Sequence, residues 1–122
     1  MKAVGLDAVE IARVAEAIAR HGDRFLARIY SDEERRIAKA SGDAAAQFYA
    51  GRFAAKEAVL KAVSQVEPRR VLAMNQVEVR NDGLGRPRII LHDRGGRASR
   101  LQIHVSLSHV DTVAVASAIA IR

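Results

Sequence analysis

Residues 43–63 read DAAAQFYAGRFAAKEAVLKAV, and this stretch decides the fold. Alanine and other strong helix formers fill it, so it predicts one long helix from Ala44 to about Val63, capped at its N-terminus by Asp43. The large apolar side chains available for packing are Phe48, Phe53, Val59 and Leu60. We therefore expect this helix to lie at the centre of the molecule.

The chain before this helix begins with the pattern of a strand and a helix. Residues 3–6 form a short apolar run that ends in Asp7, which is typical of a buried strand. Apolar residues then recur with helical spacing from Ile11 to Ile18, and Gly22 is expected to end this helix.

Two further helices are expected before the central one. The pattern over 25–30 predicts a short helix. Ser31 and Glu34 have the spacing of a capping box, in which the serine side chain and the glutamate side chain each bond to the other's backbone N–H. This predicts the start of another helix, which ends at Gly42.

The second half of the sequence changes to the two-residue period of strands. Val77 and Val79 alternate with polar residues, residues 81–85 form a glycine-containing turn, and residues 88–91 supply the partner strand of a hairpin. A weak helix is expected over 93–100, where two glycines oppose it.

Two more strands are expected near the C-terminus. Along residues 101–108, apolar side chains alternate with a polar stripe formed by His104, Ser106 and Ser108. A solvated sheet face explains this stripe as well as a binding site does. Residues 113–121 form the last strand, and small side chains on one of its faces let a helix lie close to it, namely the alanines at 114, 116, 118 and 120.

These patterns together predict an α+β fold, in which the N-terminal strand and the helices pack on a mostly antiparallel sheet. A length of 122 residues suits one domain spanning residues 1–122.

The absence of cysteine excludes disulfides and thiolate metal sites. The longest charge-free apolar stretch, residues 112–121, is about half as long as a membrane-spanning helix, and no signal peptide is evident. We expect a cytoplasmic protein that does not bind membranes.

The charge balance favours anionic partners. Twenty Lys and Arg residues against fourteen Asp and Glu residues give a net charge of +6. Nucleic acid, phosphorylated small molecules and acidic proteins all fit such a surface. The chain has few aromatic residues and no tryptophan, which disfavours a base-stacking platform for single-stranded nucleic acid.

Two carboxylates are the strongest candidates for chemistry. Asp7 follows the first apolar run, and Glu57 lies within the central helix with Lys61 one turn later. Carboxylates without thiolates suit Mg²⁺, which binds oxygen ligands and phosphates. Two simpler interpretations remain open, since Asp7 is also suited to cap a helix and Glu57 with Lys61 to form an ordinary exposed ion pair.

Three segments occur in order along the chain: GLDAVEIAR over 5–13, GRFAAKEAVLKA over 51–62 and HVSLSH over 104–109. Together they closely resemble the signatures of the holo-[acyl-carrier-protein] synthase family, the small phosphopantetheinyl transferases, and the likeness covers nearly the whole chain. Residues 64–70 depart from the family pattern, which has a glycine-rich loop at this point.

The resemblance implies transfer of 4′-phosphopantetheine from coenzyme A to a serine of apo acyl carrier protein in fatty acid biosynthesis, with adenosine 3′,5′-bisphosphate as the second product. It implies a catalytic group of Asp7, Glu57 and Lys61. Asp7 and Glu57 are expected to hold Mg²⁺ against the pyrophosphate, and Lys61 to contact phosphate. Glu57, directly or through a water on the ion, is the expected base for the serine proton, ahead of Lys61.

The resemblance also assigns two sets of binding residues. The residues expected to bind coenzyme A are Arg52, Lys56, Lys61, His104, Ser106 and Ser108. The acidic carrier protein is expected to dock on a basic stripe with an apolar anchor, formed by Arg13, Arg20, Arg24 and Phe25. The family implies a homotrimer with sites between subunits, and the last strand, which is apolar on both faces, favours association as well.

Two other functions compete with this one. A small basic module that binds nucleic acid explains the net charge but leaves Asp7 and Glu57 without a purpose. An inactive homologue, altered in the loop after Lys61, keeps the fold without the reaction.

Overall fold

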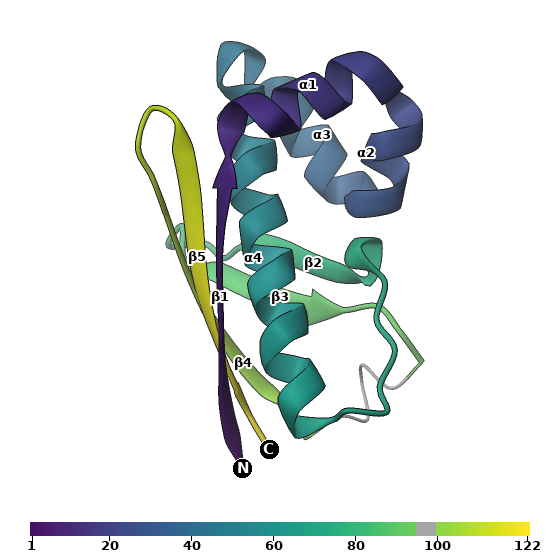
Figure 1. Cartoon of the computed structure of the whole chain (residues 1–122), viewed down its shortest axis with the longest axis vertical. Coiled ribbons are helices and arrows are strands. Elements are labelled where there is room, and N and C mark those ends of the chain that lie inside the picture. The colour runs from purple at the N-terminus through teal and green to yellow at the C-terminus, as the bar shows by residue number, and fades with distance from the viewer. Residues whose placement is uncertain (95–99) are drawn as a thin grey trace.

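In the computed structural model, which describes residues 1–94 and 100–122, the first and last strands pair along their full length (Figure 1). Strand β1 (Lys2–Glu10) is antiparallel to β5 (Val113–Ile121), and β4 (Gln102–His109) pairs with the other side of β5. The order of this sheet is therefore β1-β5-β4. The prediction that the first strand ends at Asp7 is wrong, because each of its nine residues has a partner on β5.

Helix α4 (Ala45–Val66) lies along the inner face of this sheet (Figure 1). The alanine face of β5 is buried beneath it, as predicted, since small side chains let the helix approach closely. The prediction that Asp43 caps this helix is wrong. Asp43 lies in the short 3₁₀ turn η1 (Gly42–Ala44), and Ala44 occupies the cap position without a side-chain hydrogen bond.

The predicted hairpin forms a second, two-stranded sheet from β2 (Val77–Asn81) and β3 (Pro87–Leu91). It follows the short 3₁₀ turn η2 (Met74–Gln76) and lies beside α4 (Figure 1). Gly85 has a φ of 79°, a left-handed conformation that glycine adopts without strain, and it closes the turn. The helix expected over 93–100 falls mainly on residues 95–99, which lie outside the described residues.

Three short helices cover the N-terminal half of α4 (Figure 1). They are α1 (Ile11–His21), α2 (Asp23–Ile29) and α3 (Asp32–Ala40). Gly22 ends α1 with a φ of 55°, as predicted. The capping box is confirmed, since the Glu34 backbone N–H donates to Ser31 Oγ at 3.2 Å and the Ser31 N–H donates to Glu34 Oε1 at 2.8 Å.

The architecture confirms the α+β class with antiparallel sheets. Its apolar interior has two parts, one between α4 and the strands and one between α4 and the three short helices. Within residues 1–94 and 100–122, no helix combines the length and the apolar character needed to cross a bilayer.

Candidate functional site

A cleft of about 460 Å³ contains both carboxylates that the sequence singles out. Asp7 reaches it from β1 and Glu57 from α4. Arg13 of α1 and Phe25 of α2 line the same cleft. The structure therefore joins the predicted metal ligands to two of the residues predicted to bind the carrier protein. We call this space the carboxylate cleft.

The Asp7 carboxylate is mostly buried and is held by the central helix. Its side chain is 17% exposed, and Lys61 Nζ donates to its Oδ1 at 3.2 Å. The same ammonium donates to the backbone carbonyl of Leu6 at 3.0 Å. Lys61 therefore bridges α4 to β1 at the place where the catalytic group is expected.

These contacts argue against both of the simpler interpretations left open above. Asp7 does not cap a helix, because Glu10 occupies the cap position of α1 and makes no side-chain cap hydrogen bond. Lys61 pairs with Asp7, which is distant in sequence, and this pairing replaces the expected ordinary Glu57–Lys61 pair on one helix face.

The chemistry of the carboxylate cleft suits a magnesium ion. Asp7 and Glu57 supply hard oxygen ligands, and Glu10 is a third lining carboxylate that pairs with Arg13. An open cleft leaves room for the waters that Mg²⁺ retains. Across the described parts of the chain, no three His, Cys, Asp or Glu side chains gather into a metal cluster.

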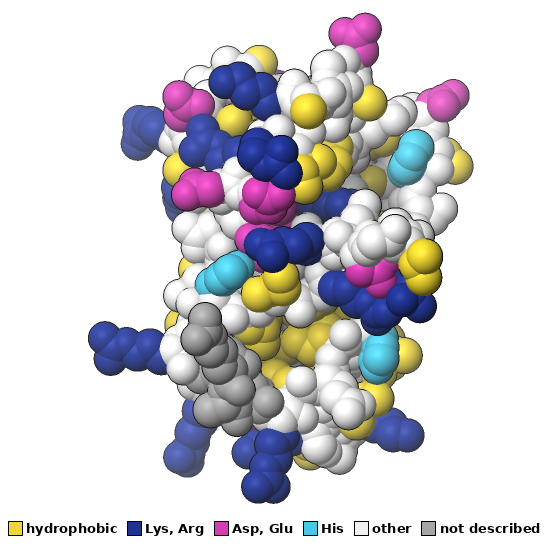
Figure 2. Space-filling view, turned by 180° about the vertical axis from the view of Figure 1, so that it is seen from behind, with side chains coloured by type: hydrophobic (Ala, Val, Ile, Leu, Met, Phe, Trp, Pro, Cys, Tyr) yellow, Lys and Arg dark blue, Asp and Glu magenta, His cyan; other side chains and the backbone are white. Residues whose placement is uncertain are grey.

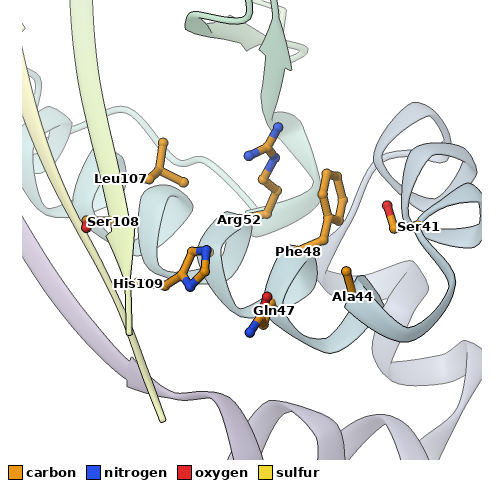
Figure 3. Close-up of a pocket in the computed structure, with 9 residues that line it drawn as sticks. Ser41, Ala44, Gln47, Phe48, Arg52, Leu107, Ser108 and His109 are labelled. Atoms are coloured by element: carbon orange, nitrogen blue, oxygen red, sulfur yellow. The ribbon is translucent and has the colours of Figure 1, made fainter. Parts of the chain in front are cut away.

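A second cleft, of about 290 Å³, lies between α4 and the end of β4 (Figure 3). Phe48 and Arg52 line it from α4, and Ser108 and His109 line it from β4. We call it the arginine cleft. It brings together two of the residues predicted to bind coenzyme A, Arg52 and Ser108.

Arg52 is the cationic group of this cleft. Its guanidinium carbon lies 4.5 Å from the centre of the Phe48 ring, and its Nη2 donates to Asn81 Oδ1 at 3.2 Å. Its Nε is buried and has no hydrogen-bond partner within the described chain. Burial lowers the pKa of Arg52, an effect that the charge of Glu34 opposes. A partly desolvated guanidinium that lines a cleft is suited to bind a phosphate.

Lys56, also predicted to bind coenzyme A, lies in the interior. Its ammonium is 2.6 Å from Glu34 Oε1, and both side chains are fully buried. It also donates to the carbonyls of Val77, at 2.5 Å, and Met74, at 3.2 Å. Burial lowers the pKa of Lys56, and Glu34 opposes this effect. Protein groups thus surround this ammonium, and Lys56 lines neither of the two clefts.

His104 and Ser106 point away from α4, on the outer face of the three-stranded sheet. In the strand register, His104 is opposite Ile119, which is opposite Val4, and Ser106 is opposite Ser117 in the next row. The polar stripe therefore lies on an exposed face, which is one of the two interpretations left open above, and one chain alone does not bring it to the carboxylate cleft.

The residues predicted to bind the carrier protein lie on α1 and α2. Arg13 is exposed and 3.7 Å from Glu10, and Arg20 donates to Glu16 at 2.9 Å. Arg24 is exposed, whereas Phe25 is half-buried against Tyr30, with ring centres 6.3 Å apart. Of this set, Arg13 and Phe25 reach the carboxylate cleft, and Arg20 and Arg24 do not line it.

Sequence reasoning missed two further groups of lining residues. Val14, Ala17 and Phe53 form an apolar wall of the carboxylate cleft. Phe48 and His109 line the arginine cleft. The position of Phe48 was available from the sequence, since it is one helical turn before Arg52 and therefore on the same side of α4.

The surface charge is unevenly distributed (Figure 2). On the face seen there, basic and acidic side chains are mixed over the upper half, whereas only Lys and Arg side chains project from the lower end. The lower end in this view is the one that carries both termini in Figure 1. The net charge of +6 is thus partly displayed as a basic pole.

The sequence of this chain is similar to those of a known protein family. The family model of the 4′-phosphopantetheinyl transferase superfamily matches residues 3–118. A holo-[acyl-carrier-protein] synthase of Koribacter versatilis is 39% identical over 94% of this chain and 94% of its own length.

Solved structures agree with this similarity. The structure of a holo-(acyl-carrier-protein) synthase from Bacillus anthracis in complex with CoA (3′,5′-ADP) has a TM-score of 0.77 and 33% identity, covering 97% of this chain and 94% of that one. The ACPS–CoA complex of Chronobacterium ammoniagenes has a TM-score of 0.85 and 28% identity, covering 99% and 97%.

Proposed function

Because the chain belongs to the 4′-phosphopantetheinyl transferase superfamily, as a holo-[acyl-carrier-protein] synthase, we propose that it modifies an acidic acyl carrier protein of fatty acid biosynthesis in a magnesium-dependent reaction. Coenzyme A donates 4′-phosphopantetheine to a carrier serine, and adenosine 3′,5′-bisphosphate leaves. The observation that carries the proposal is the carboxylate cleft, in which the magnesium-type ligands Asp7 and Glu57 share one space with the docking residues Arg13 and Phe25.

The carboxylate cleft gives each of its polar groups a task. Asp7 and Glu57 would hold Mg²⁺, which supplies positive charge to the pyrophosphate during transfer. Lys61, beside Asp7, adds a second positive charge to the phosphate side of the cleft. Glu57 is the base proposed to take the proton of the carrier serine as its oxygen attacks the phosphorus and the bond to the bridging oxygen breaks.

The arginine cleft is suited to the nucleotide end of coenzyme A. Arg52 offers a guanidinium whose carbon lies 4.5 Å from the centre of the Phe48 ring. Ser108 lines the opposite wall, with its side chain on the outer face of the sheet beside those of His104 and Ser106 (Figure 3). We place the 3′-phosphate or the pyrophosphate on Arg52, and His104 and Ser106 join this site only if they come from a neighbouring subunit.

A homotrimer would supply that neighbour. The outer face of the three-stranded sheet exposes large apolar side chains: Val4 is 63% exposed, Leu6 67% and Ile119 42%. Apolar side chains in adjacent strands form a contiguous patch, which is typical of an interface. His104 lies in the same row as Val4 and Ile119, so association through this face would bring the polar stripe to another subunit.

The experiment that tests the proposed function is mass spectrometry of apo acyl carrier protein incubated with this protein and coenzyme A. A gain of one phosphopantetheine group in the presence of Mg²⁺, and none with EDTA, is expected. An unmodified carrier protein would favour the inactive homologue. A thermal shift with a DNA oligonucleotide but none with coenzyme A and Mg²⁺ would favour the nucleic-acid-binding module.

A further inference from the structure

The Lys61 ammonium has two acceptors on β1, and they differ in kind. One is the carbonyl oxygen of Leu6 at 3.0 Å, and the other is the Asp7 carboxylate at 3.2 Å. One helical turn later, Gln65 Nε2 donates to the carbonyl of Val4 at 2.9 Å. Two successive turns of α4 thus bind alternate carbonyls of the same strand, and only Lys61 also binds a proposed metal ligand.

The Lys61–Asp7 pair is positioned to be exchanged. The Lys61 side chain is 52% exposed, so water screens its attraction to Asp7 and the pair is weak. Asp7 is mostly buried and opens into the carboxylate cleft beside Glu57. A divalent cation in this cleft would carry twice the charge of the ammonium and would meet two carboxylates where the ammonium meets one.

We propose that the Lys61 ammonium competes with the divalent cation for Asp7, so that cation binding releases Lys61 from the carboxylate. This inference rests on the proposed function, because it takes Asp7 and Glu57 as the metal ligands. The Leu6 carbonyl still accepts a hydrogen bond from the released ammonium, so Lys61 stays beside Asp7 with donors available for a phosphate. Binding of the cation then prepares Lys61 for coenzyme A, and the two ligands bind with positive cooperativity.

Competition from Lys61 lowers the apparent affinity of the protein for the cation by a measurable amount. When Lys61 occupies Asp7 for part of the time, the apparent association constant for the cation equals its intrinsic value multiplied by the fraction of molecules in which Asp7 is free. A residue that served only to bind phosphate would leave the affinity for the cation alone unchanged. The two roles therefore differ in the absence of coenzyme A.

The test is Mn²⁺ binding to the whole protein without coenzyme A, measured by the electron paramagnetic resonance signal of free Mn²⁺ and by calorimetry. Lys61→Met keeps the aliphatic stem and removes the ammonium. It is expected to bind Mn²⁺ about 3- to 5-fold more tightly than the parent protein, the range of an exposed ion pair. Circular dichroism confirms that the variant is folded.

Two matched controls separate competition from its alternatives. Gln65→Leu removes the neighbouring bond to the edge of β1 without touching Asp7, and its affinity for Mn²⁺ is expected to equal that of the parent. Arg13→Gln removes one positive charge from the same cleft, where Arg13 pairs with Glu10. Its affinity is expected to change by less than half as much as that of Lys61→Met.

Two outcomes would overturn the competition while the metal site stands. One is parental Mn²⁺ affinity in Lys61→Met, and the other is an equal gain in Arg13→Gln, which would show a general charge effect. A third outcome points elsewhere. If Asp7→Asn binds Mn²⁺ as tightly as the parent, the metal site of the proposed function is misplaced and the inference falls with it.

Discussion

Gly5 of β1 lies so close to α4 that a β-carbon at this position would be 1.8 Å from the carbonyl oxygen of Ala58. Helix backbone cannot yield as a flexible side chain does, so Gly5→Ala forces the strand and the helix apart. We expect the free energy of unfolding to fall by about 3 kcal/mol, at the upper end of overpacking effects. Urea denaturation measures this change.

Gly51→Ala is the matched control for that substitution. A β-carbon there meets only Leu107 Cδ2 at 3.7 Å, an ordinary contact, and Gly51 lies inside α4. Replacement of a helical glycine by alanine is expected to stabilise the protein by about 0.5–1 kcal/mol. Equal effects of the two substitutions would contradict the close approach at Gly5.

Lys56→Met is expected to destabilise the protein by about 3–5 kcal/mol, because it leaves the Glu34 carboxylate buried without its cation. The double variant Lys56→Met, Glu34→Gln removes the uncompensated charge and is expected to recover part of this loss. Thermal and urea unfolding of both variants give the comparison. A single variant as stable as the parent would show that the pair is not needed for stability.

Glu57→Gln is expected to reduce carrier modification at least about 100-fold and to leave the fold intact, since the amide keeps the volume but loses a charge worth several kcal/mol in the transition state. Steady-state turnover at saturating Mg²⁺ and circular dichroism check both parts. Parental turnover would remove Glu57 from the catalytic group.

Arg13→Glu tests the docking surface, because Arg13 is exposed on α1 at the mouth of the carboxylate cleft. Reversal of this charge is expected to raise the KM for an acidic carrier protein and to weaken its salt dependence, while the KM for coenzyme A stays the same. If both KM values rise equally, the residue serves a shared site or the variant is misfolded.

A shared site between subunits predicts complementation. Asp7→Ala and His104→Ala are each expected to be nearly inactive, and co-expression of the two is expected to restore part of the activity. A mixed trimer contains at least one interface at which both residues are intact. Light scattering establishes the assembly. A monomer at assay concentration, or no activity despite proven mixing, would return His104 to a role within one chain.

Features set by neighbours in the sequence were predictable. The capping box depends on Ser31 and Glu34 alone, and the alternation of alanines along 113–121 already indicates the face that α4 covers. The same holds for Gly22, which ends α1 at the expected place.

Features set by distant partners were not predictable from the pattern. Lys56 directly precedes the proposed base, a position that predicts a phosphate ligand. Its pairing with Glu34 depends on how α3 packs against α4, which the local sequence does not show. Likewise, an aspartate after an apolar run predicts the end of a strand. Strand β1 continues past Asp7 because β5 pairs with the strand and because Lys61, 54 positions away, forms an ion pair with the Asp7 carboxylate. Tertiary contacts override local preference at both places.

The two bonds from α4 to the edge of β1 also bear on aggregation. A strand at the edge of a sheet offers free carbonyls to strands of other molecules, and here the carbonyls of Val4 and Leu6 are already occupied by Gln65 and Lys61. The sheet therefore resists growth by strand addition at this edge. The protection belongs to the folded protein alone, because a chain whose central helix has not yet docked presents β1 with those carbonyls exposed.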